Sequence, residues 1–119
     1  MNKNDAGRTG EDAAARAYAA AGYRLLRRNF ATRLGEVDLI LEKDDLVVFC
    51  EVKARSEGAI AAPAEWVDAK KQRKVLAAAQ IWLQQQGLTE AHMRFDVAEV
   101  YLAGAAPPRV HIIENAFGA

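Results

Sequence analysis

The sequence predicts an α/β fold in which helices flank a mixed central sheet of four to five strands. Two observations lead to this class. Two long segments have the apolar spacing of helices, and five shorter segments are rich in the apolar residues of strands. Their order is one helix, three strands, a second helix and two strands. At 119 residues the chain can bury a core as a single domain, 1–119, without a disulfide or a structural metal.

The first helix is expected from about Gly10 to Ala21. Thr9 can cap its N-terminus, because Asp12 follows three residues later as in a capping box, and Gly22 can end it. Residues 1–8 are then expected to form a flexible tail.

Three strands are expected next, at 23–29, 36–42 and 46–54. Asp44 and Asp45 mark a turn, which makes the second and third strands a hairpin. In the third strand both faces are apolar at first, as in a central strand that is covered on both sides. Glu51 and Lys53 interrupt this pattern, and they share a face because side chains alternate along a strand.

The second half of the chain predicts a long helix from about Ala64 to Gln86, after a loop at 55–63 and closed by Gly87. The residues expected on the buried stripe of this helix are Val67, Val75, Ala78 or Ala79, and Trp82. The last two strands are expected at 93–102 and 109–114, with a Gly-Ala-Ala-Pro-Pro turn between them.

Composition narrows the class of protein. The formal net charge of zero argues against a strongly basic nucleic-acid coat, although local clusters matter more than the sum. The single cysteine, Cys50, cannot form a disulfide within the chain and is expected to be a small core residue in a reducing compartment. No stretch approaches the roughly 20 apolar residues of a membrane span, so a cytoplasmic location without a membrane partner is expected.

The central hairpin carries the strongest chemical signal. Asp38 in its first strand can approach Glu51 and Lys53 in the second, and such groups are costly to bury together. Mg²⁺ prefers oxygen ligands and keeps several waters, so Asp38 and Glu51 suffice as an anchor, with the Val52 carbonyl as a third oxygen. Lys53 would orient or deprotonate a water beside the metal. The alternative interpretation is an ion pair at the end of a strand.

Glu11 is a second acid of interest. On the first helix it shares a face with Ala14, Ala15 and Tyr18, the residues expected to pack inward. The metal cluster would give this carboxylate a partner. Placement in the first turn of the helix, where the helix dipole favours an acid, would explain it equally well.

Basic residues gather in two clusters. The clusters consist of Arg24, Arg27, Arg28 and Arg33 around the first strand, and of Lys70, Lys71, Arg73 and Lys74 in the long helix. Such groups bind phosphate backbones, but solvated helix surfaces have the same composition. Lys71 and Gln72 are the residues best placed near the start of the helix to reach a scissile phosphate.

Taken together, these segments resemble the YraN family of small bacterial proteins. The resemblance covers nearly the whole chain in order. Its motifs are Gly10-Glu11, Arg28-Asn29-Phe30, Gly35-Glu36-Val37-Asp38-Leu39-Ile40, Val48-Phe49-Cys50-Glu51-Val52-Lys53-Ala54-Arg55, Lys71-Gln72, Arg94-Phe95-Asp96-Val97 and Asn115-Ala116-Phe117.

The family is similar to the restriction-endonuclease-like superfamily and to archaeal Holliday-junction resolvases. This resemblance implies a PD-(D/E)xK nuclease core in which Asp38, Glu51 and Lys53 match the motif and Glu11 matches an additional helical acid. Val37 stands where a proline often precedes the aspartate, and proline is not a metal ligand.

The function expected from these observations is a Mg²⁺- or Mn²⁺-dependent endonuclease that acts on DNA, including branched DNA. The residues expected to contact phosphate are Arg28, Arg55, Lys71, Gln72 and Lys74. Resolving a four-way junction would require a homodimer. Two rival hypotheses remain open: a catalytically silent nucleic-acid-binding module, and an adaptor for a recombination or repair protein.

Overall fold

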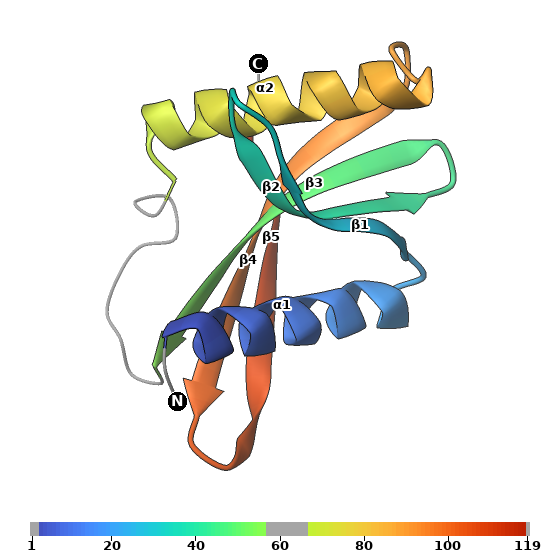
Figure 1. The fold of residues 1–119 in the computed structure, drawn as a ribbon. Coiled ribbons are helices and arrows are strands. Elements are labelled where there is room, and N and C mark those ends of the chain that lie inside the picture. The colour runs from blue at the N-terminus through green and yellow to red at the C-terminus, as the bar shows by residue number, and fades with distance from the viewer. Residues whose placement is uncertain (1–2, 57–66, 119) are drawn as a thin grey trace.

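The computed structural model describes residues 3–56 and 67–118 and confirms the predicted α/β class (Figure 1). The elements are α1 (Lys3–Ala20), β1 (Arg24–Ala31), β2 (Glu36–Lys43), β3 (Leu46–Ser56), α2 (Ala69–Gln86), β4 (His92–Ala103) and β5 (Ala106–Phe117). The strands form one five-stranded sheet in the order β1-β2-β3-β4-β5. The sheet is mixed, because β3 and β4 are parallel while the neighbouring pairs are antiparallel.

The first helix differs from its predicted bounds. α1 begins at Lys3, so residues 3–8 are helical and do not form the expected tail. Thr9 therefore lies inside the helix and not at its N-cap. Thr9 and Asp12 are the residue types of a capping box. No proline stands before them in the sequence, however, so nothing prevents the helix from extending toward the N-terminus.

The second helix begins later than predicted, at Ala69. Asp68 caps it, because its Oδ1 atom accepts a hydrogen bond of 2.8 Å from the Lys71 backbone N–H. The predicted end is confirmed, since Gly87 has the left-handed backbone of a helix C-cap, with φ of 69°. Most of the predicted loop and the first residues of the predicted helix, 57–66, lie outside the described residues.

The last two strands are longer than predicted. β5 begins at Ala106, so Pro107 and Pro108 lie in the strand and the turn contracts to Gly104 and Ala105. Both prolines are tolerated because β5 lies at an edge of the sheet, where a backbone donor is dispensable.

The two helices cover opposite faces of the sheet. The predicted stripe residues Val75, Ala78, Ala79 and Trp82 of α2 pack in one core with Phe49 and Phe95. Val67, also predicted on this stripe, is buried in the same core but precedes the helix. On the other face, α1 packs Tyr18 and neighbouring alanines against the strand residues around Cys50, which is fully buried as predicted. The two apolar layers hold α1 and α2 against the sheet.

A buried polar network ties α1 to the sheet. Asp96 has no exposed surface, and its carboxylate accepts hydrogen bonds from the Tyr18 hydroxyl at 2.7 Å and from the Arg94 Nε at 2.8 Å. The Asn115 backbone N–H also donates to it, at 3.0 Å. Because the carboxylate has several donors, its burial is compensated, and the network has a structural role.

The sheet divides between β2 and β3. Their paired residues end at Leu39 and Cys50. Beyond that point β2 stays paired with β1 as far as Glu36, while β3 stays paired with β4 as far as Ser56. Figure 1 shows the β1–β2 pair turning toward α2 as β3, β4 and β5 continue toward the other end of the molecule. We call this divergence the fork.

Gly35 lets β2 approach α2 at one arm of the fork. A Cβ atom at this position would lie 1.9 Å from the Lys74 carbonyl oxygen, a backbone atom that cannot rotate away. The preceding turn is closed by Thr32, whose backbone N–H donates to the Gly35 carbonyl at 2.8 Å. The glycine therefore sets how close the N-terminal half of α2 comes to β2.

We expect Gly35→Ala to lower the free energy of unfolding by about 3 kcal/mol, because the added methyl group overpacks a backbone contact. Gly7→Ala is the matched control: nothing lies within 4 Å of its added Cβ, so it should be neutral or stabilise the helix by up to about 1 kcal/mol. Urea unfolding measures both. Equal stability of Gly35→Ala and wild type would contradict the close packing at this arm.

Candidate functional site

Asp38 and Glu51 occupy the fork. Leu39 and Cys50 are the last paired residues of β2 and β3; Asp38 directly precedes Leu39, and Glu51 directly follows Cys50. The Val52 backbone N–H has lost its strand partner there and donates to the Asp38 Oδ2 atom at 2.8 Å. The side chain of Asp38 thus takes the place of a neighbouring backbone, and the predicted approach of the two acids is confirmed.

Glu51 is buried in an unfavourable environment for a carboxylate. It is 1% exposed, and its Oε1 atom has no hydrogen-bond partner among the described residues. Burial and the neighbouring Asp38 carboxylate raise the pKa of Glu51 to about 8, while Lys71 and Lys53 oppose part of the rise. A buried acid with a free oxygen beside a second acid needs a cation or a proton.

Lys71 supplies one cation from the first turn of α2. Its Nζ atom lies 3.6 Å from the Glu51 Oε2 atom and 3.7 Å from the Glu36 Oε1 atom. Gln72, the next residue, turns back: its side-chain amide donates to the Val67 carbonyl at 2.9 Å. Lys53 follows Glu51 on the same face of β3 and contributes to its electrostatic environment.

Glu11 reaches the neighbouring strand β1 from α1. Its Oε1 atom accepts hydrogen bonds from the Asn29 side-chain amide at 3.1 Å and from Arg28 at 3.3 Å. By the register of β1 and β2, Asn29 lies opposite Asp38. Because α1 begins at Lys3, Glu11 is not in the first helical turn, and the explanation by the helix dipole is wrong.

Asn29 has a left-handed backbone, with φ of 52°, inside a strand. Asparagine tolerates this conformation better than most residues do, and such strain often accompanies functional sites. Asn29 lies in the motif Arg28-Asn29-Phe30, but no role was predicted for it. The available signal was an asparagine inside a strand, where this residue type is disfavoured.

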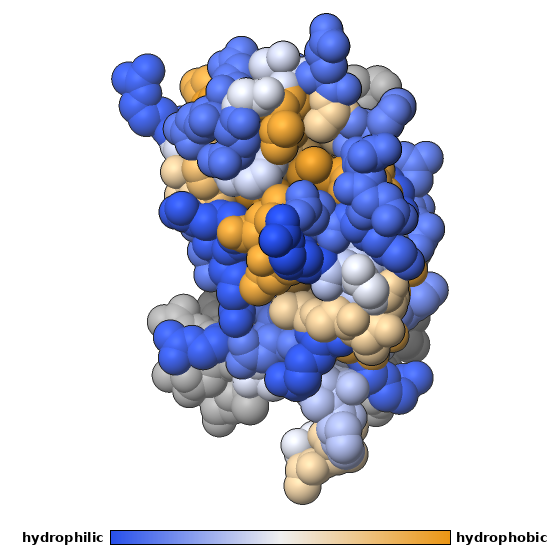
Figure 2. Space-filling model, turned by 90° about the vertical axis from the view of Figure 1, so that its right-hand side faces the viewer, coloured by the Kyte–Doolittle hydropathy of each residue, from blue (hydrophilic) through white to orange (hydrophobic). Residues whose placement is uncertain are grey.

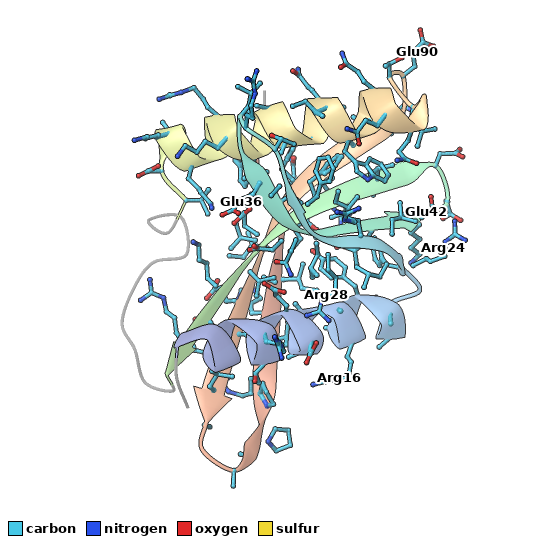
Figure 3. The ribbon with its side chains drawn as sticks, in the orientation of Figure 1. Arg16, Arg24, Arg28, Glu36, Glu42 and Glu90 are labelled. Carbon is cyan, nitrogen blue, oxygen red and sulfur yellow. The ribbon has the colours of Figure 1, made fainter. Side chains whose placement is uncertain are left out.

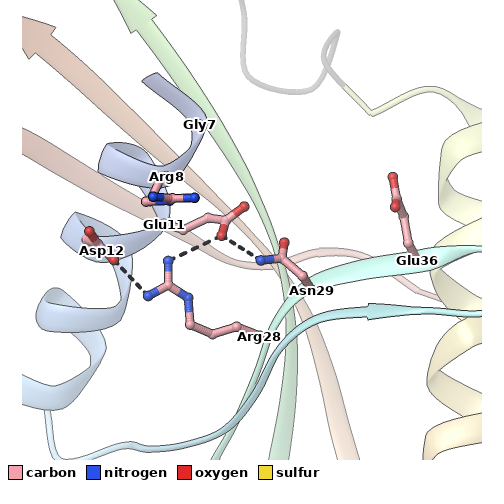
Figure 4. Close-up of a pocket in the computed structure, with 7 residues that line it drawn as sticks. All are labelled: Gly7, Arg8, Glu11, Asp12, Arg28, Asn29 and Glu36. Atoms are coloured by element: carbon pink, nitrogen blue, oxygen red, sulfur yellow. Dashed lines mark hydrogen bonds and ion pairs between the residues drawn. The ribbon is translucent and has the colours of Figure 1, made fainter. Parts of the chain in front are cut away.

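Two grooves meet at Glu36. The larger, of ≈ 780 Å³, is lined by Gly7, Arg8, Glu11, Asp12, Arg28, Asn29 and Glu36 (Figure 4). The smaller, of ≈ 260 Å³, is lined by Thr32, Arg33, Leu34, Gly35, Glu36, Lys71 and Lys74. Figure 3 shows Glu36 beside α2 and Arg28 beside α1.

The charges of the two grooves differ. The larger groove has three acids against two arginines, and Arg28 is bound by Asp12 at 2.7 Å as well as by Glu11. The smaller groove has three basic residues against Glu36 alone. The smaller groove is therefore the better match for a phosphate, and Arg28 would have to leave its acids to contact one.

The donor set at the fork fits a hard divalent cation. Asp38 and Glu51 give two carboxylates, and the Val52 carbonyl points to the same side of β3 as its N–H, toward Asp38. Within residues 3–56 and 67–118, no three His, Cys, Asp or Glu side chains gather as a complete metal site. Mg²⁺ keeps several waters and needs only one or two carboxylates, so the acid pair suffices.

Few large apolar side chains of the described residues are exposed. Figure 2 shows one face on which hydrophilic side chains predominate and apolar side chains form limited patches. In the described part of the chain, the exposed large apolar residues are Leu25, Leu34, Leu88 and Met93. Neither α1 nor α2 is apolar enough along its length to cross a membrane.

Comparison with known proteins places the chain among uncharacterised relatives. Residues 10–100 match the model of the "Uncharacterised protein family UPF0102". A UPF0102 protein of Ectopseudomonas mendocina is 42% identical over 98% of this chain and 97% of its own length. One from Anaeromyxobacter dehalogenans is 44% identical, over 93% of this chain and 82% of its own length. One from Desulforapulum autotrophicum is 37% identical, over 97% and 94%.

The raised pKa of Glu51 predicts how stability depends on pH. Its ordinary value is 4.5, so between about pH 4.5 and 8 the folded protein holds a proton that the unfolded chain has released. The free energy of unfolding in EDTA should therefore fall as pH rises through this window, by at most about 1.4 kcal/mol per pH unit from this group.

Glu51→Gln removes this titration and preserves the volume of the side chain. We expect the variant to match wild type near pH 5 and to exceed it in stability at pH 8, in urea unfolding with EDTA. Parallel pH profiles for the two proteins would show that burying the Glu51 carboxylate does not lower the stability of the folded protein.

Proposed function

The chain belongs to the UPF0102 family, also known as YraN, and we propose that it is a metal-dependent nuclease that hydrolyses phosphodiester bonds. One observation carries the proposal. Glu51 is buried beside Asp38, with an oxygen atom free, at the point where β2 and β3 diverge. Such a pair lowers the stability of the folded protein unless a cation is bound there, and this is a common sign of a functional site.

Asp38, Glu51 and the Val52 carbonyl would hold Mg²⁺ or Mn²⁺, with Glu11 acting through water as a further acid. The ion would supply Lewis-acid polarisation of the phosphate and a more acidic water. Asn29 would help to position Glu11, because its side-chain amide donates to the Glu11 carboxylate and Asn29 itself lies opposite Asp38 in the sheet.

Lys53 and the smaller of the two grooves, which we call the basic groove, would bind and orient the substrate. Lys53 shares a face of β3 with Glu51, so its ammonium group can orient the attacking water and balance charge on the phosphate. Lys71 and Lys74 line the basic groove beside the acid pair and would contact the phosphate backbone. Arg55 and Arg28 are further candidates for phosphate contacts. Gln72 acts indirectly, because its amide holds the chain that enters α2.

The proposed substrate is DNA, including branched DNA, in the cytoplasm. Cutting both strands of a junction symmetrically would require a homodimer. The small size of the domain leaves room for a repair or recombination protein to supply substrate recognition. These assignments follow from the resemblance to junction resolvases and from the basic groove.

The test is cleavage of labelled four-way junction, flap, single-stranded and duplex DNA with Mg²⁺ or Mn²⁺. We expect metal-dependent cleavage by wild type and a loss of about 100-fold or more in Glu51→Gln and Asp38→Asn, because each removes a carboxylate that would hold the metal ion. Glu42→Gln is the matched control, since Glu42 lies on β2 with Asp38 but pairs with Arg24 at its far end.

Full activity in Glu51→Gln would contradict the assignment of the site. DNA binding by wild type without cleavage by either metal would favour a binding module. Neither binding nor a rise in melting temperature with metal would favour an adaptor, because a bound metal stabilises the folded state by linkage.

A further inference from the structure

The two ion pairs of Lys71 have an unusual geometry. Its ammonium group lies between a buried acid, Glu51, and Glu36, whose side chain is 63% exposed. Both N–O distances, 3.6 Å and 3.7 Å, are longer than those of a charge-assisted hydrogen bond. The contact therefore neutralises charge without locking the side chain in place. The Lys71 side chain is 29% exposed and lines the basic groove.

The position of Lys71 in the helix is a second, independent observation. Lys70, Lys71, Arg73 and Lys74 all lie in the first two turns of α2, and no acid lies in its first turn. A helix N-terminus carries a partial positive charge, so these cations destabilise the helix that bears them. The Asp68 carboxylate at the N-cap and anions from outside the helix offset this cost, and Glu36 and Glu51 are the outside anions that Lys71 meets.

We infer that Lys71 is an exchangeable counter-ion: it neutralises Glu51 and Glu36 when the fork holds no metal, and moves to a substrate phosphate when a divalent metal binds there. This inference rests on the proposed function, and it adds a regulation of the same site. A cation at Asp38 and Glu51 would repel the ammonium group of Lys71 and neutralise the carboxylate that attracts it. The basic groove offers it a new position beside Lys74.

The exchange couples the two ligands. Metal binding releases Lys71 for phosphate, and phosphate withdraws Lys71 from the acids that the metal needs. Coupling between two ligands is reciprocal, so metal should strengthen nucleic-acid binding by the same factor by which nucleic acid strengthens metal binding. The protein would then bind metal weakly until a substrate is present.

Lys71→Met tests the inference, with Lys71→Gln as a second variant that keeps a polar side chain. Lys74→Met is the matched control. Lys74 lines the same groove, but among the described residues it forms no ion pair with Glu51 or Glu36. Mn²⁺ affinity is measured by calorimetry at one fixed pH for all the proteins. Binding of a fluorescein-labelled DNA junction is measured by anisotropy in EDTA and in Ca²⁺, which also prefers oxygen ligands.

Without DNA, both Lys71 variants should bind Mn²⁺ about tenfold more tightly than wild type, the size of a typical coupling. Lys74→Met should keep the Mn²⁺ affinity of wild type. Ca²⁺ should strengthen DNA binding by wild type and by Lys74→Met, and this gain should shrink in both Lys71 variants.

Unchanged or weaker Mn²⁺ binding in both Lys71 variants, with metal-dependent cleavage intact in wild type, would overturn this inference and leave the proposed function standing. A wild-type protein that binds no Mn²⁺, with or without DNA, would overturn both.

Discussion

The repulsion between two carboxylates at the fork is the constraint around which the structure is arranged. Asp38 and Glu51 are brought together because β2 and β3 stop pairing at Leu39 and Cys50. The Asp38 carboxylate accepts a hydrogen bond from the Val52 N–H, which has no strand partner there. Glu51 is buried, and its Oε1 atom has no hydrogen-bond partner among the described residues. A buried charge without full compensation costs stability, and a native protein retains it where a ligand or a reaction requires it.

Both helices serve this site from opposite faces of the sheet. α2 approaches β2 closely because Gly35 has no side chain, and this brings Lys71 to the acid pair. α1 is fixed by Tyr18 and the Asp96 network, and it presents Glu11 to Asn29 on the other side. The apolar layers thus determine which charged groups can meet at the fork. Local packing and site chemistry are consequently hard to change independently.

The sequence predicted the positions of Asp38, Glu51 and Lys53 in the sheet better than it predicted the limits of the helices. Alternation along β3 placed Glu51 and Lys53 on one face, because strand geometry alone determines this. The α1 boundary was wrong, since Thr9 and Asp12 satisfy a capping pattern that the longer helix overrides. The contact of Lys71 with both Glu36 and Glu51 was not predictable, because it depends on how closely α2 packs on β2. Arg28 was expected at phosphate, but pattern gave no indication that Asp12 and Glu11 would bind it.

The proposed function requires Asp38 and Glu51 to form a divalent-metal site. The decisive measurement is anomalous scattering from a crystal grown with Mn²⁺. We expect a manganese peak within coordination distance of Asp38, Glu51 and the Val52 carbonyl, with waters completing the coordination and Lys71 displaced from Glu51. An empty fork at saturating Mn²⁺, with Lys71 still against Glu51, would contradict it.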